Sequence, residues 1–174
     1  MKMNINKYLD EFKSVFEDIK KQYNKLDEIV DIIKQSEKIY IAGNGASALI
    51  SSHLALHLRQ LGYDAISLTD NVGLVTAEAN DDEYKNIFMN QLYSTSDRGD
   101  ILIIFSGSGN SENVVTGAKY MIDIGEKVIA FVGTDGGELS MMEDVECFHV
   151  NGDMQHAEDA FSIICHLLLR CLDE

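Results

Sequence analysis

Five short apolar segments, separated by segments of helical periodicity, constrain the fold of this chain more than any other feature. They cover residues 38–43, 64–69, 100–106, 127–133 and 146–150. Strands that are apolar on both faces are typical of a parallel sheet covered by helices on both sides. We therefore expect an α/β fold with a doubly wound, mostly parallel five-stranded sheet.

Helical segments fill the intervals between these strands and lie at both ends of the chain. We expect helices at about 4–23, 25–35, 46–61, 112–124 and 155–171, with shorter pieces between 70 and 93. With 174 residues, the chain is long enough to bury one substantial core. We expect a single domain over residues 1–174, in which a helical hairpin (1–36) precedes the α/β core (37–174).

Charge and composition exclude several kinds of partner. The formal charge of −15 should repel nucleic acid and anionic lipid. No apolar run approaches the roughly 20 residues of a membrane span, and the polar N-terminus lacks the apolar core of a signal peptide. Three cysteines in apolar surroundings (Cys147, Cys165 and Cys171) indicate reduced core thiols. We expect a cytoplasmic protein without a nucleic-acid or membrane partner.

Two loops follow strands at the carboxyl edge of the expected sheet, where such folds bind ligands. The first, residues 43–47, reads Gly-Asn-Gly-Ala-Ser. Its glycines permit a tight turn, and its N–H groups begin a helix. The spacing also resembles a dinucleotide fingerprint, with Asp70 in the place of a ribose-binding acid. An ordinary strand–helix turn is a serious alternative.

The second loop, residues 106–111, reads Ser-Gly-Ser-Gly-Asn-Ser. Its three hydroxyls belong to Ser106, Ser108 and Ser111, and the last of these precedes the next helix. A helix cap needs one serine rather than three. We therefore interpret this loop as a phosphate cradle that works without positive charge. A dehydrogenase has no need of such a loop, and the chain has no room for a separate substrate domain.

Three of the five histidines could bind a metal. His53 and His57 lie four residues apart and so share one face of a helix. A ligand pair and a polar helix edge are equally good interpretations of them. His166 lies in an almost wholly apolar helix, so spacing alone favours a buried core histidine. Glu158, Asp159 and Gln155 precede it, and spacing does not choose among them. His149 and His156 carry weaker signals.

Taken together and in order, the motifs resemble one known family. "AGNGASA", "SLTD", "AND", "GDILIIFSGSGNSENVV" and "VIAFVGTDGGEL" are similar to the sugar isomerase (SIS) domain, and within it to the phosphoheptose isomerases. The likeness covers nearly the whole chain. It implies a flavodoxin-like sandwich and a homotetramer with active sites between subunits. It also implies a role in supplying heptose for lipopolysaccharide or other surface glycans.

The resemblance implies a set of substrate-binding residues. These are Asn44, Gly45, Ser47, Asp70, Ser106, Ser108 and Ser111. The serines would bind the phosphate of a phosphorylated sugar, and Asn44 and Asp70 would lie near the sugar itself. The family loop usually reads Ser-Thr-Ser, whereas Gly107 stands here in place of the threonine. The cradle therefore has one hydroxyl donor fewer.

The metal site implied by the resemblance is altered as well. The family carries a histidine and, four residues later, a glutamate; here they are His53 and His57. On the last helix it carries a glutamine and, eight residues later, a histidine; here they are Glu158 and His166. Imidazole and carboxylate suit zinc, so we expect one divalent metal per site, held by these four residues.

The expected function is a metal-assisted aldose–ketose isomerase. Its substrate pair would be sedoheptulose 7-phosphate and D-glycero-D-manno-heptose 7-phosphate, and another phosphosugar is the alternative substrate. Glu158 is the expected base for the proton transfer between C1 and C2, and His166 its acid/base partner. His57 is the alternative base. The alternative function is a non-catalytic SIS module that binds a sugar phosphate or a protein, as a relative binds the replication initiator.

Overall fold

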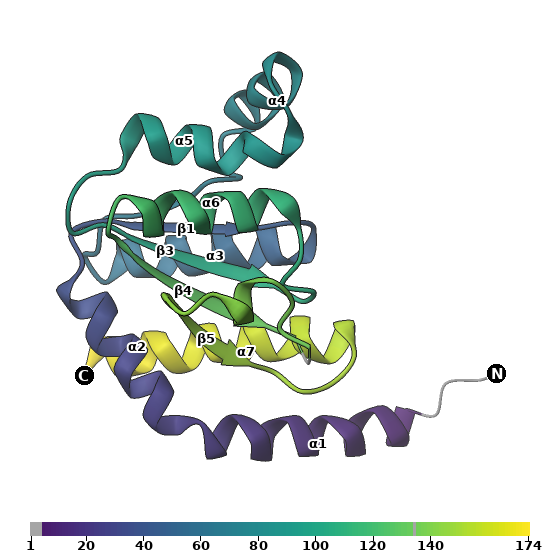
Figure 1. Ribbon diagram of the computed structural model, residues 1–174. Helices are drawn as coiled ribbons and strands as arrows, with labels where there is room; N and C mark the ends of the chain where they lie inside the picture. Colours follow the sequence, from purple (N-terminus) through teal and green to yellow (C-terminus); the bar gives the residue numbers. More distant parts are fainter. Residues whose placement is uncertain (1–4, 134) are drawn as a thin grey trace.

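A single sheet of five parallel strands, in the order β2-β1-β3-β4-β5, organises the fold (Figure 1). The computed structural model describes residues 5–133 and 135–174. The strands are β1 (Ile39–Gly43), β2 (Ala65–Ser67), β3 (Ile101–Ser106), β4 (Lys127–Val132) and β5 (Val145–His149). The expected sheet is confirmed, with every pairing parallel. The strand order reverses direction beside β1, so a crevice is expected between the carboxyl ends of β1 and β3.

Helices cover both faces of this sheet. They are α1 (Ile5–Lys21), α2 (Tyr23–Gln35), α3 (Ala46–Gln60), α4 (Val72–Asp81), α5 (Ile87–Thr95), α6 (Glu112–Asp123) and α7 (Met154–Asp173), with the short 3-10 helices η1 (Tyr84–Asn86) and η2 (Leu139–Met141). Helices α2, α3 and α7 pack on one face, and α5 and α6 on the other. All side chains of α4 are exposed or half-buried, and this helix stands away from the sheet in Figure 1.

Alternation along the strands divides the core in two. Ile41 and Ile103 point towards α3 and α7, whereas Tyr40 and Leu102 point towards α5 and α6. Both sets are fully buried, and this explains why the strands are apolar at every position. The ring of Phe105 lies 5.5 Å from that of Phe161, which fixes α7 against the end of β3.

The N-terminal helices pack on the sheet's α7 side. Val15 and Ile19 of α1 are buried, and the Tyr8 hydroxyl donates a hydrogen bond to Asp159 at 2.7 Å. This carboxylate, together with burial, raises the pKa of Tyr8 to about 12. The outer surface of α1 leaves Leu9 exposed.

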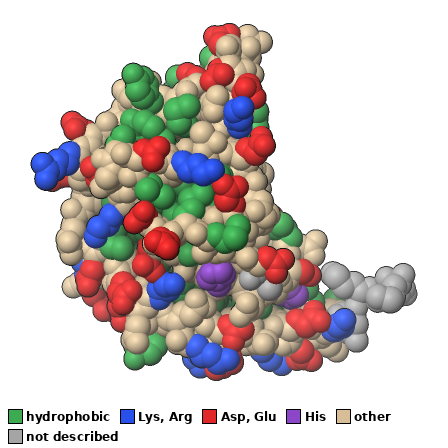
Figure 2. All heavy atoms as spheres, in the orientation of Figure 1, with side chains coloured by type: hydrophobic (Ala, Val, Ile, Leu, Met, Phe, Trp, Pro, Cys, Tyr) green, Lys and Arg blue, Asp and Glu red, His purple; other side chains and the backbone are tan. Residues whose placement is uncertain are grey.

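The surface is rich in acidic side chains, in line with the formal charge of −15. Acidic side chains are spread over the face drawn in Figure 2, with exposed hydrophobic side chains between them. No helix among the described residues is long and apolar enough to cross a membrane. Cys147 and Cys165 are buried as expected, but Cys171 is exposed, because it lies on the solvent side of the last turn of α7.

Candidate active site

The loop after β1 turns tightly into α3. Gly45 has a φ of 57°, which a glycine adopts without strain. At Gly43 a Cβ would lie 2.8 Å from the backbone of Ser47, so only glycine lets the strand end this close to the helix. Both glycines therefore serve the close turn that the sequence predicts, and they place the buried Ser47 at the crevice between β1 and β3.

The serine loop after β3 rests on the backbone of the segment that follows β4. Gly109 has a φ of 64°, and a Cβ on it would lie 1.9 Å from the carbonyl oxygen of Gly136. The N–H of Gly133 donates to the Gly107 carbonyl at 3.2 Å, and that of Leu139 to the Gly109 carbonyl at 3.1 Å. These contacts hold the serine loop against the segment that follows β4.

The two loops and the start of α7 enclose a hollow of about 160 Å³, which we call the serine hollow. Its lining residues are Asn44, Ser47, Phe105, Ser106, Gly107, Ser108, Ser111, Met154 and Glu158. Glu158 is its only charged lining residue within the described chain. Helices α3, α6 and α7 all begin around it. Their N-terminal dipoles supply the positive potential that an anion needs.

The hydroxyls of the serine loop remain able to donate. The Ser106 oxygen accepts from the Gly109 N–H at 3.1 Å, and the Ser108 oxygen accepts from the Asn110 N–H at 3.2 Å. A hydroxyl that accepts a hydrogen bond still has its own proton to donate. Ser111 occupies the N-cap position of α6, but within the described structure its side chain makes no capping bond. The arrangement therefore fits anion binding better than helix capping.

An amide network holds Asn44 at the rim of the serine hollow. Asn44 and Asn113 exchange two side-chain hydrogen bonds of 2.8 Å, and the Tyr84 hydroxyl donates to the side-chain oxygen Oδ1 of Asn44 at 3.1 Å. Sequence reasoning missed Asn113 and Tyr84. Asn113 sits on the buried face of α6, and a polar residue in that stripe was the available signal.

Asp70 lies at a different hollow. It accepts a hydrogen bond from the Ser52 hydroxyl and lies with Arg59 and Gln60 around a cavity beside β2. The described chain does not bring Asp70 among the residues of the serine hollow, so its contact with a sugar stays a prediction.

The three predicted histidine ligands come together between α3 and α7, in what we call the histidine cluster (His53, His57 and His166). The Nε2 atoms of His53 and His166 are 2.9 Å apart. The ring centres of His53 and His57 are 4.6 Å apart, and those of His57 and His166 6.5 Å. Burial lowers the pKa of His53, and the neighbouring charges of His57 and His166 lower it further. The Nδ1 of His57 lies 2.9 Å from the Gln60 side-chain oxygen.

His166 corrects one expectation from spacing. It is exposed, not a buried core histidine. Leu167 beside it is also partly exposed, so the outer stripe of α7 is apolar enough to look like core in the sequence.

Glu158, the fourth predicted ligand, lies with the serines rather than with the histidine cluster. It lines the serine hollow, and its separation of eight positions from His166 corresponds to about 12 Å along a helix. Among the described residues, no group of three or more His, Cys, Asp or Glu side chains is arranged to hold a metal. The donor types suit zinc, but one chain does not gather all four around a point.

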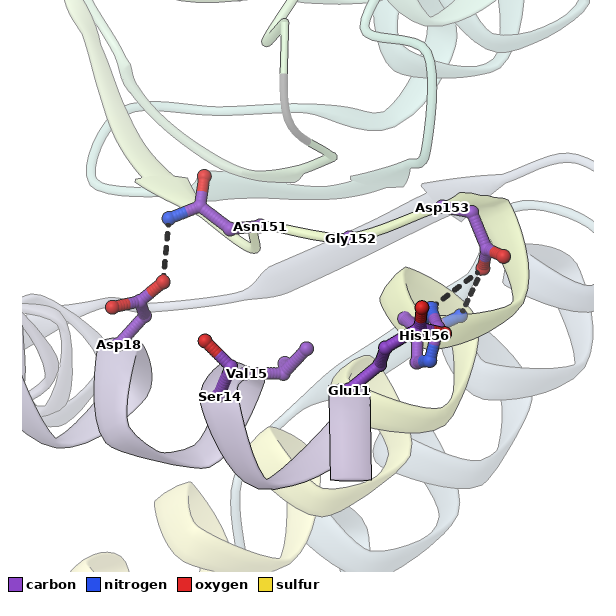
Figure 3. Close-up of a pocket in the computed structure, with 8 residues that line it drawn as sticks. All are labelled: Glu11, Ser14, Val15, Asp18, Asn151, Gly152, Asp153 and His156. Carbon is purple, nitrogen blue, oxygen red and sulfur yellow. Dashed lines mark hydrogen bonds and ion pairs between the residues drawn. The ribbon is translucent and has the colours of Figure 1, made fainter. Parts of the chain in front are cut away.

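A separate hollow of about 340 Å³ lies between α1 and the loop that precedes α7 (Figure 3). His156 is 3% exposed there. Its Nδ1 lies 2.8 Å from the Asp153 carboxylate, but neither ring nitrogen makes a hydrogen bond within the described residues. The Asp18 carboxylate in this hollow is already paired with Lys21 and Asn151. The hollow shares no lining residue with the serine hollow.

Comparison with known proteins gives a consistent picture. The SIS domain family model matches residues 7–133. The phosphoheptose isomerase of Helicobacter pylori (strain P12) is 30% identical, over 94% of this chain and 92% of its own. The probable phosphoheptose isomerase of Thermoplasma acidophilum is 33% identical over 99% of both chains. The structure of phosphoheptose isomerase GmhA from Neisseria gonorrhoeae superposes with a TM-score of 0.90 at 25% identity, covering 97% of this chain and 96% of that one.

Proposed function

Because the chain belongs to the SIS-domain family and is a phosphosugar isomerase, we propose that it interconverts sedoheptulose 7-phosphate and D-glycero-D-manno-heptose 7-phosphate. The observation that carries this proposal is the serine hollow. It combines hydroxyl donors, three helix starts and a single carboxylate. The hydroxyls and helix dipoles bind the phosphate, and the carboxylate of Glu158 faces the remainder of the sugar.

Glu158 would act as the base of a proton transfer through an enediol. It takes a proton from C1 of the ketose and returns it to C2, while a proton passes from the C1 hydroxyl to the C2 oxygen. Reactant and product are isomers, so no co-reactant is needed. A carboxylate within a hollow that holds the sugar by its phosphate is well placed for this step.

The transfer of the proton from the C1 hydroxyl to the C2 oxygen requires a second acid/base group, and we propose His166 for this role. Glu158 and His166 of one chain are about 12 Å apart along α7, which is too far for both to reach one pair of carbons. We therefore propose a homotetramer with sites between subunits, in which the histidine comes from a second copy. Exposed apolar side chains on α1 and α3, namely Leu9, Phe16, Leu49 and Leu56, support such an assembly.

Zinc is the proposed cofactor, and the histidine cluster would hold it. The short approach of two imidazole nitrogens supports this assignment. When bound, zinc would supply a Lewis acid for the carbonyl oxygen of the sugar. Glu158 would then remain the base only if it stays outside the ligand set, because a cation favours the carboxylate's deprotonated form. His57 would be the base if Glu158 is a ligand.

The proposed setting is the cytoplasm, where the product would supply heptose for lipopolysaccharide or other surface glycans. The related phosphoheptose isomerases support this assignment. A screen of ketose phosphates by proton NMR in deuterium oxide tests the function. We expect aldose signals and deuterium at the exchanged carbon with sedoheptulose 7-phosphate, and none with unphosphorylated sedoheptulose. Binding without any exchange would favour the non-catalytic SIS module instead.

A further inference from the structure

Met154 occupies the space of a side chain at position 107. A Cβ built on Gly107 would lie 2.2 Å from the Sδ of Met154 and 3.1 Å from its terminal methyl carbon. Both residues line the serine hollow, together with Glu158. Met154 is the first residue of α7, and it is 51% exposed, so its side chain covers the loop without being buried in the core.

The character of Met154 differs from that of its neighbours in the hollow. The side chains that surround it there are short and polar (Asn44, Ser47, Ser106, Ser108 and Ser111), and Phe105 is buried behind them. A methionine is long and adapts its shape, and it offers no strong hydrogen bond. It therefore limits the room in the hollow that the serines and Glu158 line by bulk alone.

We propose that Met154 is a specificity-determining residue that limits the length of the phosphosugar. This inference rests on the proposed function, since it concerns the same hollow. The phosphate is fixed by the serine loop and the reacting carbons lie towards Glu158. The carbons between them are expected to contact Met154, because Met154 lies against Gly107 of the loop and lines the hollow together with Glu158, four residues further along the same face of α7.

The position of the Met154 side chain depends in turn on the size of residue 107, which is glycine here. At Gly109 and Gly133 a Cβ would meet backbone oxygens at 1.9 and 2.3 Å, which cannot move cheaply. At Gly107 it would meet the far end of a flexible side chain instead. A residue larger than glycine at position 107 is therefore expected to displace Met154 and leave the loop's backbone in place. Residue 107 then controls the hollow through residue 154.

A double-mutant cycle tests the inference. The variants are Met154→Ala, Gly107→Ala and the double variant. For each, kcat/KM is measured with ketose phosphates of five, six and seven carbons. We expect Met154→Ala to raise the ratio for seven over five carbons roughly tenfold or more, since single methylenes are worth a factor of this order. Gly107→Ala should also change the ratio, but by less than about twofold when Met154 is already alanine, because nothing remains to be displaced.

Three controls make the result specific to size. Met154→Gln keeps the length of the side chain and should keep the parent's ratio within about twofold. Met141→Ala removes an exposed methionine on η2 and should leave the ratio unchanged. The inhibition constant of inorganic phosphate should also stay within about twofold in Met154→Ala, since the serine loop is intact.

The inference is wrong if Met154→Ala keeps the parent's ratio, or if Gly107→Ala has the same effect with and without Met154. If the parent isomerises none of these sugars, the proposed function fails instead. The same ratio is then measured from dissociation constants by calorimetry. An unchanged ratio there would also overturn the role of Met154, and a shift of roughly tenfold would support it independently of catalysis.

Discussion

The Nε2 atoms of His53 and His166 lie 2.9 Å apart, although 113 residues separate them in the chain. Two facing imidazole nitrogens at this distance share one proton, with one ring as the donor and the other as the acceptor. A shared proton requires different tautomers in the two rings. The ring centre of His57 is 4.6 Å from that of His53, and these three histidines are the residues that would hold the proposed zinc.

The metal content follows from this arrangement. Protein purified without a chelator should contain about one zinc per chain, because the ligands form one set per site. The variant His53→Ala/His57→Ala should lose it, and His149→Ala, which changes a histidine outside the cluster, should not. Elemental analysis of the three proteins decides the matter. Equal metal in all three, or a metal-free parent with full activity, would contradict a zinc-assisted mechanism.

Phosphate affinity should depend on hydroxyls. Ser108→Ala and Ser111→Ala each remove a donor to a charged group, worth about 1.5–3 kcal/mol. Each change should therefore raise KM roughly ten- to 150-fold. Ser94→Ala, an exposed serine on α5, serves as the matched control. Steady-state kinetics gives the measurement, and a double variant with the parent's KM would show that the phosphate binds elsewhere.

Catalysis should depend on the carboxylate of Glu158. Glu158→Gln keeps the shape of the side chain but removes the base, so solvent-deuterium exchange at C1 and C2 should be lost while binding is largely retained. Adding His57→Glu should recover part of the exchange. Exchange is followed by NMR and binding by calorimetry. Exchange at the parent's rate in Glu158→Gln would move the base to another residue, and His57 would be the first to test.

The stability of the serine loop should depend on Gly109. Its φ of 64° and the Gly136 oxygen, 1.9 Å from where a Cβ would stand, both exclude a larger residue. We expect Gly109→Ala to lower the free energy of unfolding by about 2–5 kcal/mol. Gly62 also has a positive φ, of 95°, but open space around it. Gly62→Ala should cost only about 1–2 kcal/mol. Urea denaturation compares the two, and equal losses would show that the contact with Gly136 is unimportant.

Mild acid should destabilise the fold partly through His149. Burial, with a smaller contribution from the charge of Lys25, lowers the pKa of His149 below its ordinary value of 6.5. The unfolded chain therefore binds a proton at higher pH than the folded one. The free energy of unfolding should decrease as the pH falls through 6.5 and level off below the folded pKa.

His149→Gln removes this titrating group. The variant should lose less stability than the parent between pH 7.5 and the folded pKa, in paired urea titrations. A parallel decrease in both proteins would assign the acid sensitivity to other groups, such as His53.

The strands could be located from sequence because helices cover both faces of the sheet. Their apolar runs are continuous, and the structure confirms all five. The greatest difference is β2, expected over 64–69 and observed as Ala65–Ser67. It is an edge strand that pairs only with β1, in register at three positions. The Leu68 N–H still donates to the Ile41 carbonyl at 2.9 Å, so the strand ends just after this bond, although Thr69 is β-branched.

The site was predictable as two loops and a set of helix positions, but not as contacts. The serine loop and the Gly-rich turn could be predicted because they depend on residues that are adjacent in the sequence, namely their glycines and serines. The pairing of Asn44 with Asn113 and the contact of Gly107 with Met154 join residues 69 and 47 positions apart. Such contacts depend on how three helices pack on the sheet, and a single sequence carries no record of that.

Helix α3 begins at the serine hollow and ends beyond the histidine cluster. From Ser47 to His53 is six residues, or about 9 Å of axis, and to His57 ten residues, or about 15 Å. The constant rise of the helix fixes the distances between these residues. Point substitutions can alter the chemistry at either end, but they cannot change the spacing. An inserted residue would shift one end by about 1.5 Å and rotate it by about 100°. Substitutions at the walls of the hollow can therefore alter its size, while the spacing between Ser47 and the two histidines of the same helix stays fixed.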